Sequence, residues 1–220
     1  MNVALALYPR FTLLDIIGPF QVLADVPGFD VELVAEHAGP VVDHTGITSL
    51  AATKTFDQVT APDVVVVPGT LGGDEHDEAL VAWLRRVHQT TSWTTSVCTG
   101  SIALAAAGIL DGVDATTHWA RKDVLERFGA RYTHDRVVER GKVITAAGVS
   151  SGIDMALTLV ARVLGPDMAM AAQLGIEYDP APPFDAGSPA KAPEPIVELV
   201  SATVNQAAAE HEAATTGGGL

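Results

Sequence analysis

The side chain with the clearest chemical potential is Cys98, the single cysteine of the chain. It lies in W-T-T-S-V-C-T-G-S-I-A-L-A-A-A-G (93–108), where a strand-like run is followed by the cysteine, small residues and a helix-forming stretch. This order is typical of a nucleophile elbow, with cysteine in the place of serine. A helix that begins beside the sulfur favours the thiolate, so we expect a lowered pKa and a nucleophilic Cys98. A buried, inert cysteine is the alternative interpretation.

A carboxylate and a hydroxyl are candidate partners of this nucleophile. Asp15 lies in F-T-L-L-D-I-I-G-P-F (11–20), directly after the first strand-like run. Apolar neighbours should desolvate its carboxylate and raise its pKa, which suits a proton shuttle beside a thiol. The alternative is an aspartate that caps a helix. Thr99 follows Cys98 and could either cap the next helix or donate a hydrogen bond to a substrate.

Two further segments could contribute to a substrate site. The turn P-G-T-L-G-G (68–73) can direct backbone N–H groups at a developing negative charge, which makes Gly69 and Thr70 candidate substrate-binding residues. A plain flexible loop is the alternative. His118 and Trp119 could line the same pocket or form a structural aromatic pair. The acidic segment around His76 (74–77) lacks a second spaced His or Cys pair, so we interpret it as a solvated helix start and predict no metal site.

Strands and helices that alternate along the chain must position these residues. Strand-like runs cover 3–7, 29–35, 63–67 and 93–97, helix-like patterns cover 12–23, 75–88, 100–107, 120–128, 153–164 and 168–174, and hairpins are predicted within 41–52 and 137–145. The uninterrupted D-V-V-V-V run is typical of a parallel strand buried on both faces. We therefore predict an α/β fold with a doubly wound, mainly parallel sheet flanked by helices. Ligands should bind beyond the carboxyl ends of its strands.

Composition narrows the class of protein. A net charge of −14 over 220 residues makes nucleic acid an unfavourable partner, and no basic amphipathic stretch indicates a membrane surface. A single cysteine excludes a disulfide within the chain and favours a reducing compartment. The first residues read as a buried strand and not as a signal peptide, so we expect a cytoplasmic protein. We expect one α/β domain over 1–195, followed by a helix and flexible tail over 196–220, with the helix over 196–212.

Four motifs resemble those of the ThiJ/PfpI superfamily: V-C-T-G-S (97–101), A-T-T-H-W (115–119), L-D-I-I-G-P (14–19) and V-P-G (67–69). This resemblance implies a flavodoxin-like, class I glutamine-amidotransferase-like fold. Within the superfamily, Q-L-G-I-E-Y-D-P-A-P-P-F-D-A-G-S-P (173–189) is similar to a stretch typical of the isocyanide hydratases.

The resemblance implies an enzyme that adds water to a small-molecule isocyanide and releases an N-substituted formamide, without a cofactor and as a homodimer. Cys98 would attack the isocyanide carbon to form a thioimidate, while Asp15 would exchange protons with Cys98 and activate water. Thr99 matches the threonine of the family. Many relatives carry glutamate and histidine where this chain has Asp15 and Thr99, which weakens protease-like, glyoxalase-like and deglycase-like activities. Thr70 departs from the second glycine that we expected after Pro68-Gly69, which puts an anion-stabilising role of this turn in doubt.

A ligand sensor or a redox sensor that uses Cys98 is the alternative function. Similar domains occur fused to AraC-type helix-turn-helix regulators. The stretch after the predicted core is short and is not basic, so we expect no DNA-binding part of that kind here.

Overall fold

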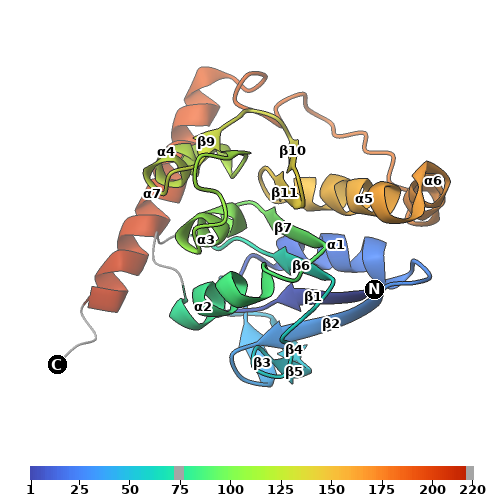
Figure 1. Cartoon of the computed structure of the whole chain (residues 1–220). Helices are drawn as coiled ribbons and strands as arrows, with labels where there is room; N and C mark the ends of the chain where they lie inside the picture. Colours follow the sequence, from blue (N-terminus) through green and yellow to red (C-terminus); the bar gives the residue numbers. More distant parts are fainter. Residues whose placement is uncertain (72–76, 217–220) are drawn as a thin grey trace.

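A mostly parallel sheet organises the chain (Figure 1). Within residues 1–71 and 77–216, which this computed structural model describes (side chains only to residue 210), the main sheet has seven strands in the order β10-β11-β7-β6-β1-β2-β5. They are β1 Asn2–Ala6, β2 Asp30–Ala35, β5 Lys54–Thr55, β6 Val64–Val67, β7 Trp93–Val97, β10 Val137–Arg140 and β11 Val143–Ala146. Within this sheet, only β10 and β11 pair in antiparallel fashion. The predicted mainly parallel α/β fold is confirmed.

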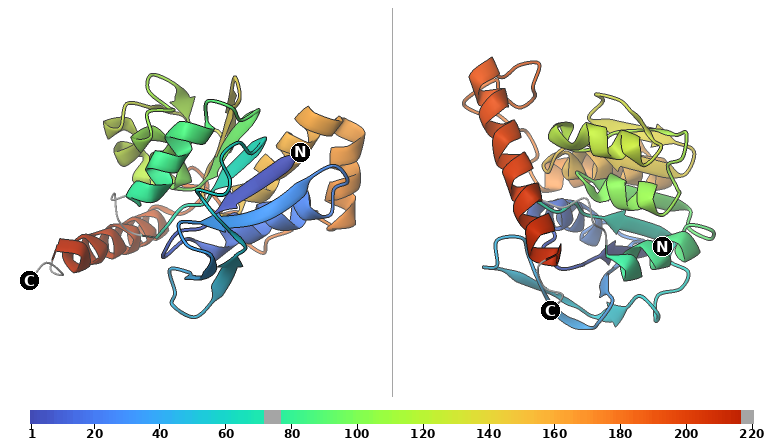
Figure 2. Two further views of the ribbon diagram at one scale, coloured as in Figure 1. Left: turned by 60° about the horizontal axis from the view of Figure 1, so that its bottom comes forward. Right: turned by 90° about the vertical axis from the view of Figure 1, so that its left-hand side faces the viewer.

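Helices cover both faces of this sheet, as Figures 1 and 2 show. On one face, α1 packs against α5, which in turn contacts α6, while α3 lies on the other face between α2 and α4. The bounds are α1 Leu13–Ala24, α2 Glu78–Val87, α3 Gly100–Ala106, α4 Lys122–Arg127, α5 Ser151–Leu164 and α6 Pro166–Gly175. The helix predicted over 75–88 is thus seen from Glu78, and residues 75 and 76 lie outside the described part.

The central position of β6 determines where the site lies. All four valines of β6 are buried, and the strand pairs with β1 on one side and β7 on the other. Because these three strands run in the same direction, the segments that follow them meet at one edge of the sheet. Asp15 follows β1, Gly69 follows β6 and Cys98 follows β7.

Two glycines allow α1 and α5 to cross closely behind this edge. A Cβ on Gly18 of α1 would lie 3.0 Å from the Cγ1 of Ile153 in α5. A Cβ on Gly152 of α5 would lie 3.1 Å from Val97 and 3.2 Å from Pro19. The close crossing fixes the first turn of α1, and with it Asp15, against the end of β7.

Short elements complete the fold. The predicted hairpin within 41–52 is formed by β3 (Gly39–Val42) and β4 (Ser49–Ala52), and the one within 137–145 by β10 and β11, so both predictions are confirmed. The two-residue strands β8 (Asp114–Ala115) and β9 (Arg131–Tyr132) and the 3-10 helix η1 (Trp119–Arg121) were not expected. Elements of two or three residues are too short to produce a hydrophobic period that sequence analysis could detect.

The last helix, α7, spans Glu194–Thr216 and is longer than the 196–212 helix that the sequence predicts. It lies outside the layered core, along the side of the molecule toward which β1 and β2 point (Figure 1), and part of it extends beyond the core (Figure 2). Throughout the described residues, the helices are too short or too polar to span a bilayer.

Candidate active site

Cys98 occupies a strained turn between β7 and α3. Its φ angle is +58°, in the left-handed region that residues other than glycine seldom adopt. The Cys98 N–H donates to the carbonyls of Ala146 (3.0 Å) and Ala147 (2.9 Å), so the neighbouring strand β11 holds the turn from one side. The predicted strand-to-helix elbow is confirmed, and its backbone is strained at Cys98.

Two hydroxyls hold the other side of the elbow. The Cys98 carbonyl accepts hydrogen bonds from Thr117 Oγ1 and Ser101 Oγ, each at 3.1 Å. Both side chains are fully buried. Thr117 belongs to the A-T-T-H-W motif, of which only His118 and Trp119 were candidate site residues from the sequence. The motif therefore also stabilises the unusual backbone of the cysteine.

Asp15 lies in the first turn of α1 and is completely buried. Its Oδ2 accepts a hydrogen bond from the Gly69 N–H at 2.8 Å, while Oδ1 has no hydrogen-bond partner within the described residues. Burial raises the pKa of Asp15 from 3.8 to about 7, against the lowering effects of the Gly69 N–H and the Cys98 side chain. A carboxyl group with this pKa can take up and release a proton near neutral pH, as the sequence predicts.

The Cys98 thiol departs from the sequence-based expectation. Burial and the negative charge of Asp15 raise the pKa of Cys98, although N–H groups of Val149 and Thr99 and the Thr99 side chain act in the opposite direction. The prediction of a lowered pKa is wrong, because it considered the following helix but not the depth at which the thiol is buried or the negative charge of Asp15. Asp15 and Cys98 therefore compete for protons, and the pair holds one proton after its first ionisation near pH 7.

The Gly69–Thr70 turn holds the acid and the threonine in place. The Thr70 N–H donates to Thr99 Oγ1 at 2.9 Å, and the Thr99 hydroxyl donates to the Thr70 carbonyl at 3.0 Å. The Thr99 side chain makes no cap to α3, so the capping interpretation is wrong. Since the Gly69 N–H binds Asp15, neither N–H of this turn is available to an anion in this state. Gly72, Gly73 and His76 lie outside the described residues.

Glycine is required at position 69 for steric reasons. A Cβ there would lie 2.5 Å from Thr99 Oγ1 and 3.0 Å from Asp15 Oδ2. On the other side of the turn, the buried Tyr8 hydroxyl donates to the Pro68 carbonyl at 2.8 Å. Tyr8 was not recognised in the sequence, where it reads only as the end of the first strand.

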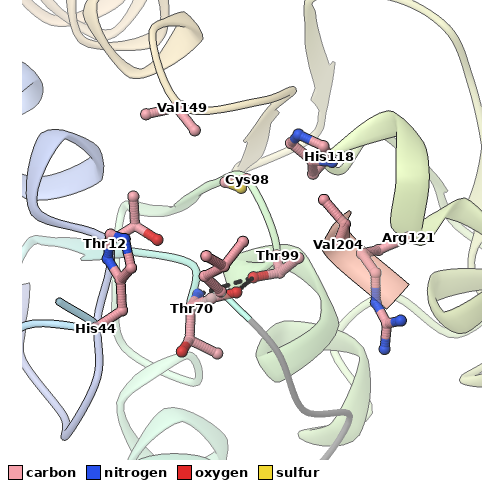
Figure 3. A pocket seen from close by; sticks show the side chains of 10 residues that line it. Thr12, His44, Thr70, Cys98, Thr99, His118, Arg121, Val149 and Val204 are labelled. Atoms are coloured by element: carbon pink, nitrogen blue, oxygen red, sulfur yellow. Dashed lines mark hydrogen bonds between the residues drawn. The ribbon is translucent and has the colours of Figure 1, made fainter. Parts of the chain in front are cut away.

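A cavity of about 260 Å³ opens above Cys98 (Figure 3). Its walls come from seven separate parts of the chain, and only Thr70, Cys98, Thr99 and His118 among them were candidate residues from the sequence. The lining residues are Thr12, His44, Thr70, Leu71, Cys98, Thr99, His118, Arg121, Val149 and Val204. Among the described residues, no three His, Cys, Asp or Glu side chains gather as metal ligands.

His118 contributes a neutral imidazole to this cavity. Burial lowers the pKa of His118, and its Nδ1 accepts a hydrogen bond from the Ala120 N–H at 3.3 Å. This bond leaves the proton on Nε2. Trp119 stacks on His118 with ring centroids 5.6 Å apart and is not part of the cavity lining. The proposed contact of Trp119 with substrate stays a prediction.

The raised pKa of Asp15 predicts a pH dependence of stability. The folded protein keeps a proton on Asp15 that the unfolded chain releases between about pH 4 and pH 7, so stability falls as pH rises through this window. Asp15→Asn should remove this fall. Relative to wild type, the free energy of unfolding of the variant should rise by up to about 4 kcal/mol between pH 4 and pH 8. Urea titrations at several pH values measure the free energy of unfolding of both proteins. The same dependence of this free energy on pH in wild type and Asp15→Asn would contradict the raised pKa of Asp15.

The fold and the site define an α/β protein with a cysteine at a strand-to-helix elbow and a buried carboxyl group beside it. The DJ-1/PfpI family model matches residues 1–162, and the chain belongs to this family. The isonitrile hydratase of Pseudomonas putida is 43% identical over 90% of this chain and 87% of its own length. A ThiJ/PfpI family protein from Pseudomonas syringae has a crystal structure that is 36% identical, covers 94% of this chain and 89% of its own, and superposes with a TM-score of 0.87.

A regulator is also among the relatives. The HTH-type transcriptional regulator CdhR of Pseudomonas aeruginosa is 30% identical over 74% of this chain, but the match spans only 51% of the regulator. The proteins similar to this chain therefore include both an enzyme and a transcriptional regulator.

Proposed function

We propose that this chain is an enzyme that adds water to an isocyanide and releases an N-substituted formamide. The observation that carries the proposal is the buried Asp15 carboxyl group beside Cys98, which itself lines a small cavity. The similarity of this chain to the isonitrile hydratase of P. putida also supports the proposal, since isonitrile is another word for isocyanide. The catalytic residues are Cys98, as nucleophile, and Asp15, as proton carrier.

The first step forms a covalent bond between Cys98 and the substrate. With one proton on the pair, the sulfur attacks the terminal isocyanide carbon while Asp15 delivers the former thiol proton to that same carbon. The product is a thioimidate, R–N=CH–S–Cys98, and Asp15 is left as a carboxylate. Because the pair loses its first proton near pH 7, its reactive one-proton form is abundant at neutral pH.

The second step releases the formamide. The Asp15 carboxylate accepts a proton from water as its oxygen adds to the thioimidate carbon, and this proton passes to the nitrogen. The tetrahedral intermediate then expels the Cys98 sulfur, and its hydroxyl proton returns to the Asp15–Cys98 pair. One water is consumed, R–NH–CHO is formed, and the enzyme regains its starting state.

Thr99 supports this chemistry as a positioning residue. Its hydroxyl joins the loop after β6 to the elbow through both hydrogen bonds with Thr70. The N–H groups of Val149 and Thr99 interact with the Cys98 sulfur and lower its pKa, so they stabilise the charge that it carries as the thioimidate forms and breaks down.

The direct test of the activity is product formation. Purified protein is mixed with cyclohexyl isocyanide at pH 7.5, and the formyl proton of the expected formamide is followed by NMR. We expect formamide to appear at a rate proportional to the protein concentration. A stand-alone sensor, the second candidate that the resemblance to CdhR favours, would bind isocyanide or another ligand and release no formamide.

We further propose that the enzyme is a cytoplasmic homodimer. An open groove beside the cavity is lined by Leu13, Leu14, Ile17 and Ile47, of which Ile47 is 88% exposed. Burial of this apolar surface against a second copy would stabilise the dimer. Sedimentation at micromolar concentration should give twice the 22.9 kDa chain mass. A monomer under these conditions would contradict the assembly and leave the chemistry of the site untouched.

A further inference from the structure

Among the described side chains of the C-terminal helix α7, only one reaches the cavity above Cys98. Val204 lines the cavity and is only 7% exposed, and Ala208, one turn later, is 5% exposed. Val197 and Ser201 on the same stripe are half-buried. The spacing of four, three and four residues places all four on one face of the helix. This face lies against the body of the protein near η1.

We propose that Val204 sets the size of the group that can reach Cys98, which makes it a specificity-determining residue of the cavity. With the proposed function as its basis, the inference extends to the substrate: the preferred isocyanides carry compact substituents. Nothing in the chemistry of the Asp15–Cys98 pair requires this restriction. It follows from the shape of the cavity and from the element that closes it.

The other walls near the sulfur are fixed by contacts that the chemistry needs. Cys98 is held at the elbow, and Thr99 and Thr70 are joined by two hydrogen bonds. Val149 directs its N–H toward the sulfur. Val204 has no such role, so its side chain fills space alone. Figure 3 shows it on the same side of Cys98 as His118, across the cavity from Thr12 and His44.

The small volume of the cavity predicts which substituents it excludes. About 260 Å³ is below the roughly 300–1,000 Å³ that is usual for drug-sized ligands, so a bulky substituent needs more room than the closed cavity offers. The alternative exit is the groove beside α1, which shares Thr12, His44 and Val149 with the cavity. If substituents leave through that groove, Val204 has no influence on their size. The experiment must therefore distinguish a substituent that lies against Val204 from one that leaves through the groove beside α1.

The single cysteine permits a test that does not depend on turnover. Second-order rates of Cys98 alkylation are measured with iodoacetamide and with the bulkier N-cyclohexylmaleimide in wild type, Val204→Ala and Val204→Phe. The ratio of the two rates cancels changes in the thiol pKa. Val200→Ala is the matched control, because Val200 lies one turn earlier on α7 and is 37% exposed. The same four proteins are assayed for kcat/KM with isopropyl and adamantyl isocyanide.

We expect Val204→Ala to raise the bulky-to-small ratio about tenfold and Val204→Phe to lower it, with Val200→Ala within about twofold of wild type. Opposite changes in the two Val204 variants would show an effect of side-chain size at position 204. A loosened α7 would instead raise access to Cys98 in both variants. Equal ratios in wild type and both Val204 variants would overturn the inference, as would an equal change in Val200→Ala. If the alkylation ratios follow the expectation but none of the proteins forms formamide, Val204 limits the size of the group that reaches Cys98 and the proposed hydratase activity is wrong.

Discussion

Replacing Cys98 by serine is expected to lower formamide production by at least about 10³-fold, because the variant keeps the size of the side chain and loses the nucleophile. The environment that raises the pKa of the thiol is even less favourable to an alkoxide, since a hydroxyl is a far weaker acid. The rate is measured by NMR with cyclohexyl isocyanide in excess. Thermal unfolding of the variant should match that of wild type, since the elbow is held by backbone and hydroxyl contacts.

Thr99→Val is the comparison variant for this result. It removes a hydroxyl next to the nucleophile and leaves the sulfur and the carboxyl group in place. The loss should be on the order of 1 kcal/mol in transition-state stabilisation, or about fivefold in rate. Equal losses in Cys98→Ser and Thr99→Val would mean that disturbance of the elbow, and not loss of the thiol, decides the rate.

Asp15→Asn is expected to lower turnover by about 10²-fold or more, because the amide can accept the Gly69 N–H but cannot carry a proton. In wild type, the pair becomes reactive when it loses its first proton. The kcat/KM should therefore rise with pH and reach half its plateau near pH 7, the pKa of Asp15. This titration should be absent from the residual activity of the variant.

The pH profile of kcat/KM is measured with a neutral isocyanide, so that only groups of the free enzyme titrate. A wild-type profile that is flat between pH 5 and pH 8 would contradict the assignment of proton transfer to Asp15. The same conclusion would follow if Asp15→Asn kept the wild-type dependence on pH.

The elbow could be predicted from the sequence because all of its parts are adjacent. The strand, Cys98 and the small residues of α3 follow one another within 93–108, and the local order of residue types determines the turn. The meeting of Asp15, Gly69 and Cys98 followed from one added premise, that the three strands run parallel. The positive φ angle of Cys98 confirms the tight turn that this local order predicts.

The remainder of the site depends on contacts between distant segments. The direction of the Cys98 pKa shift depends on the depth of burial and on the distance to Asp15, neither of which a motif specifies. Thr117 supports the elbow from 19 residues away, and Val204 reaches the cavity from the last helix. Thr99 bonds to Thr70 instead of capping its own helix, because the tight approach at Gly69 brings the loop within reach.

The most direct test of the account is the mass of the protein during turnover. Wild-type protein is mixed with excess cyclohexyl isocyanide, quenched in acid within milliseconds to seconds, and analysed as intact protein and as peptides, while formamide is quantified in the same samples. We predict a transient gain equal to the mass of one isocyanide, located on the peptide that contains Cys98 and lost when the substrate is exhausted. Formamide formed at an undiminished rate by Cys98→Ser, with no such adduct on wild type at any time, would contradict covalent catalysis by Cys98.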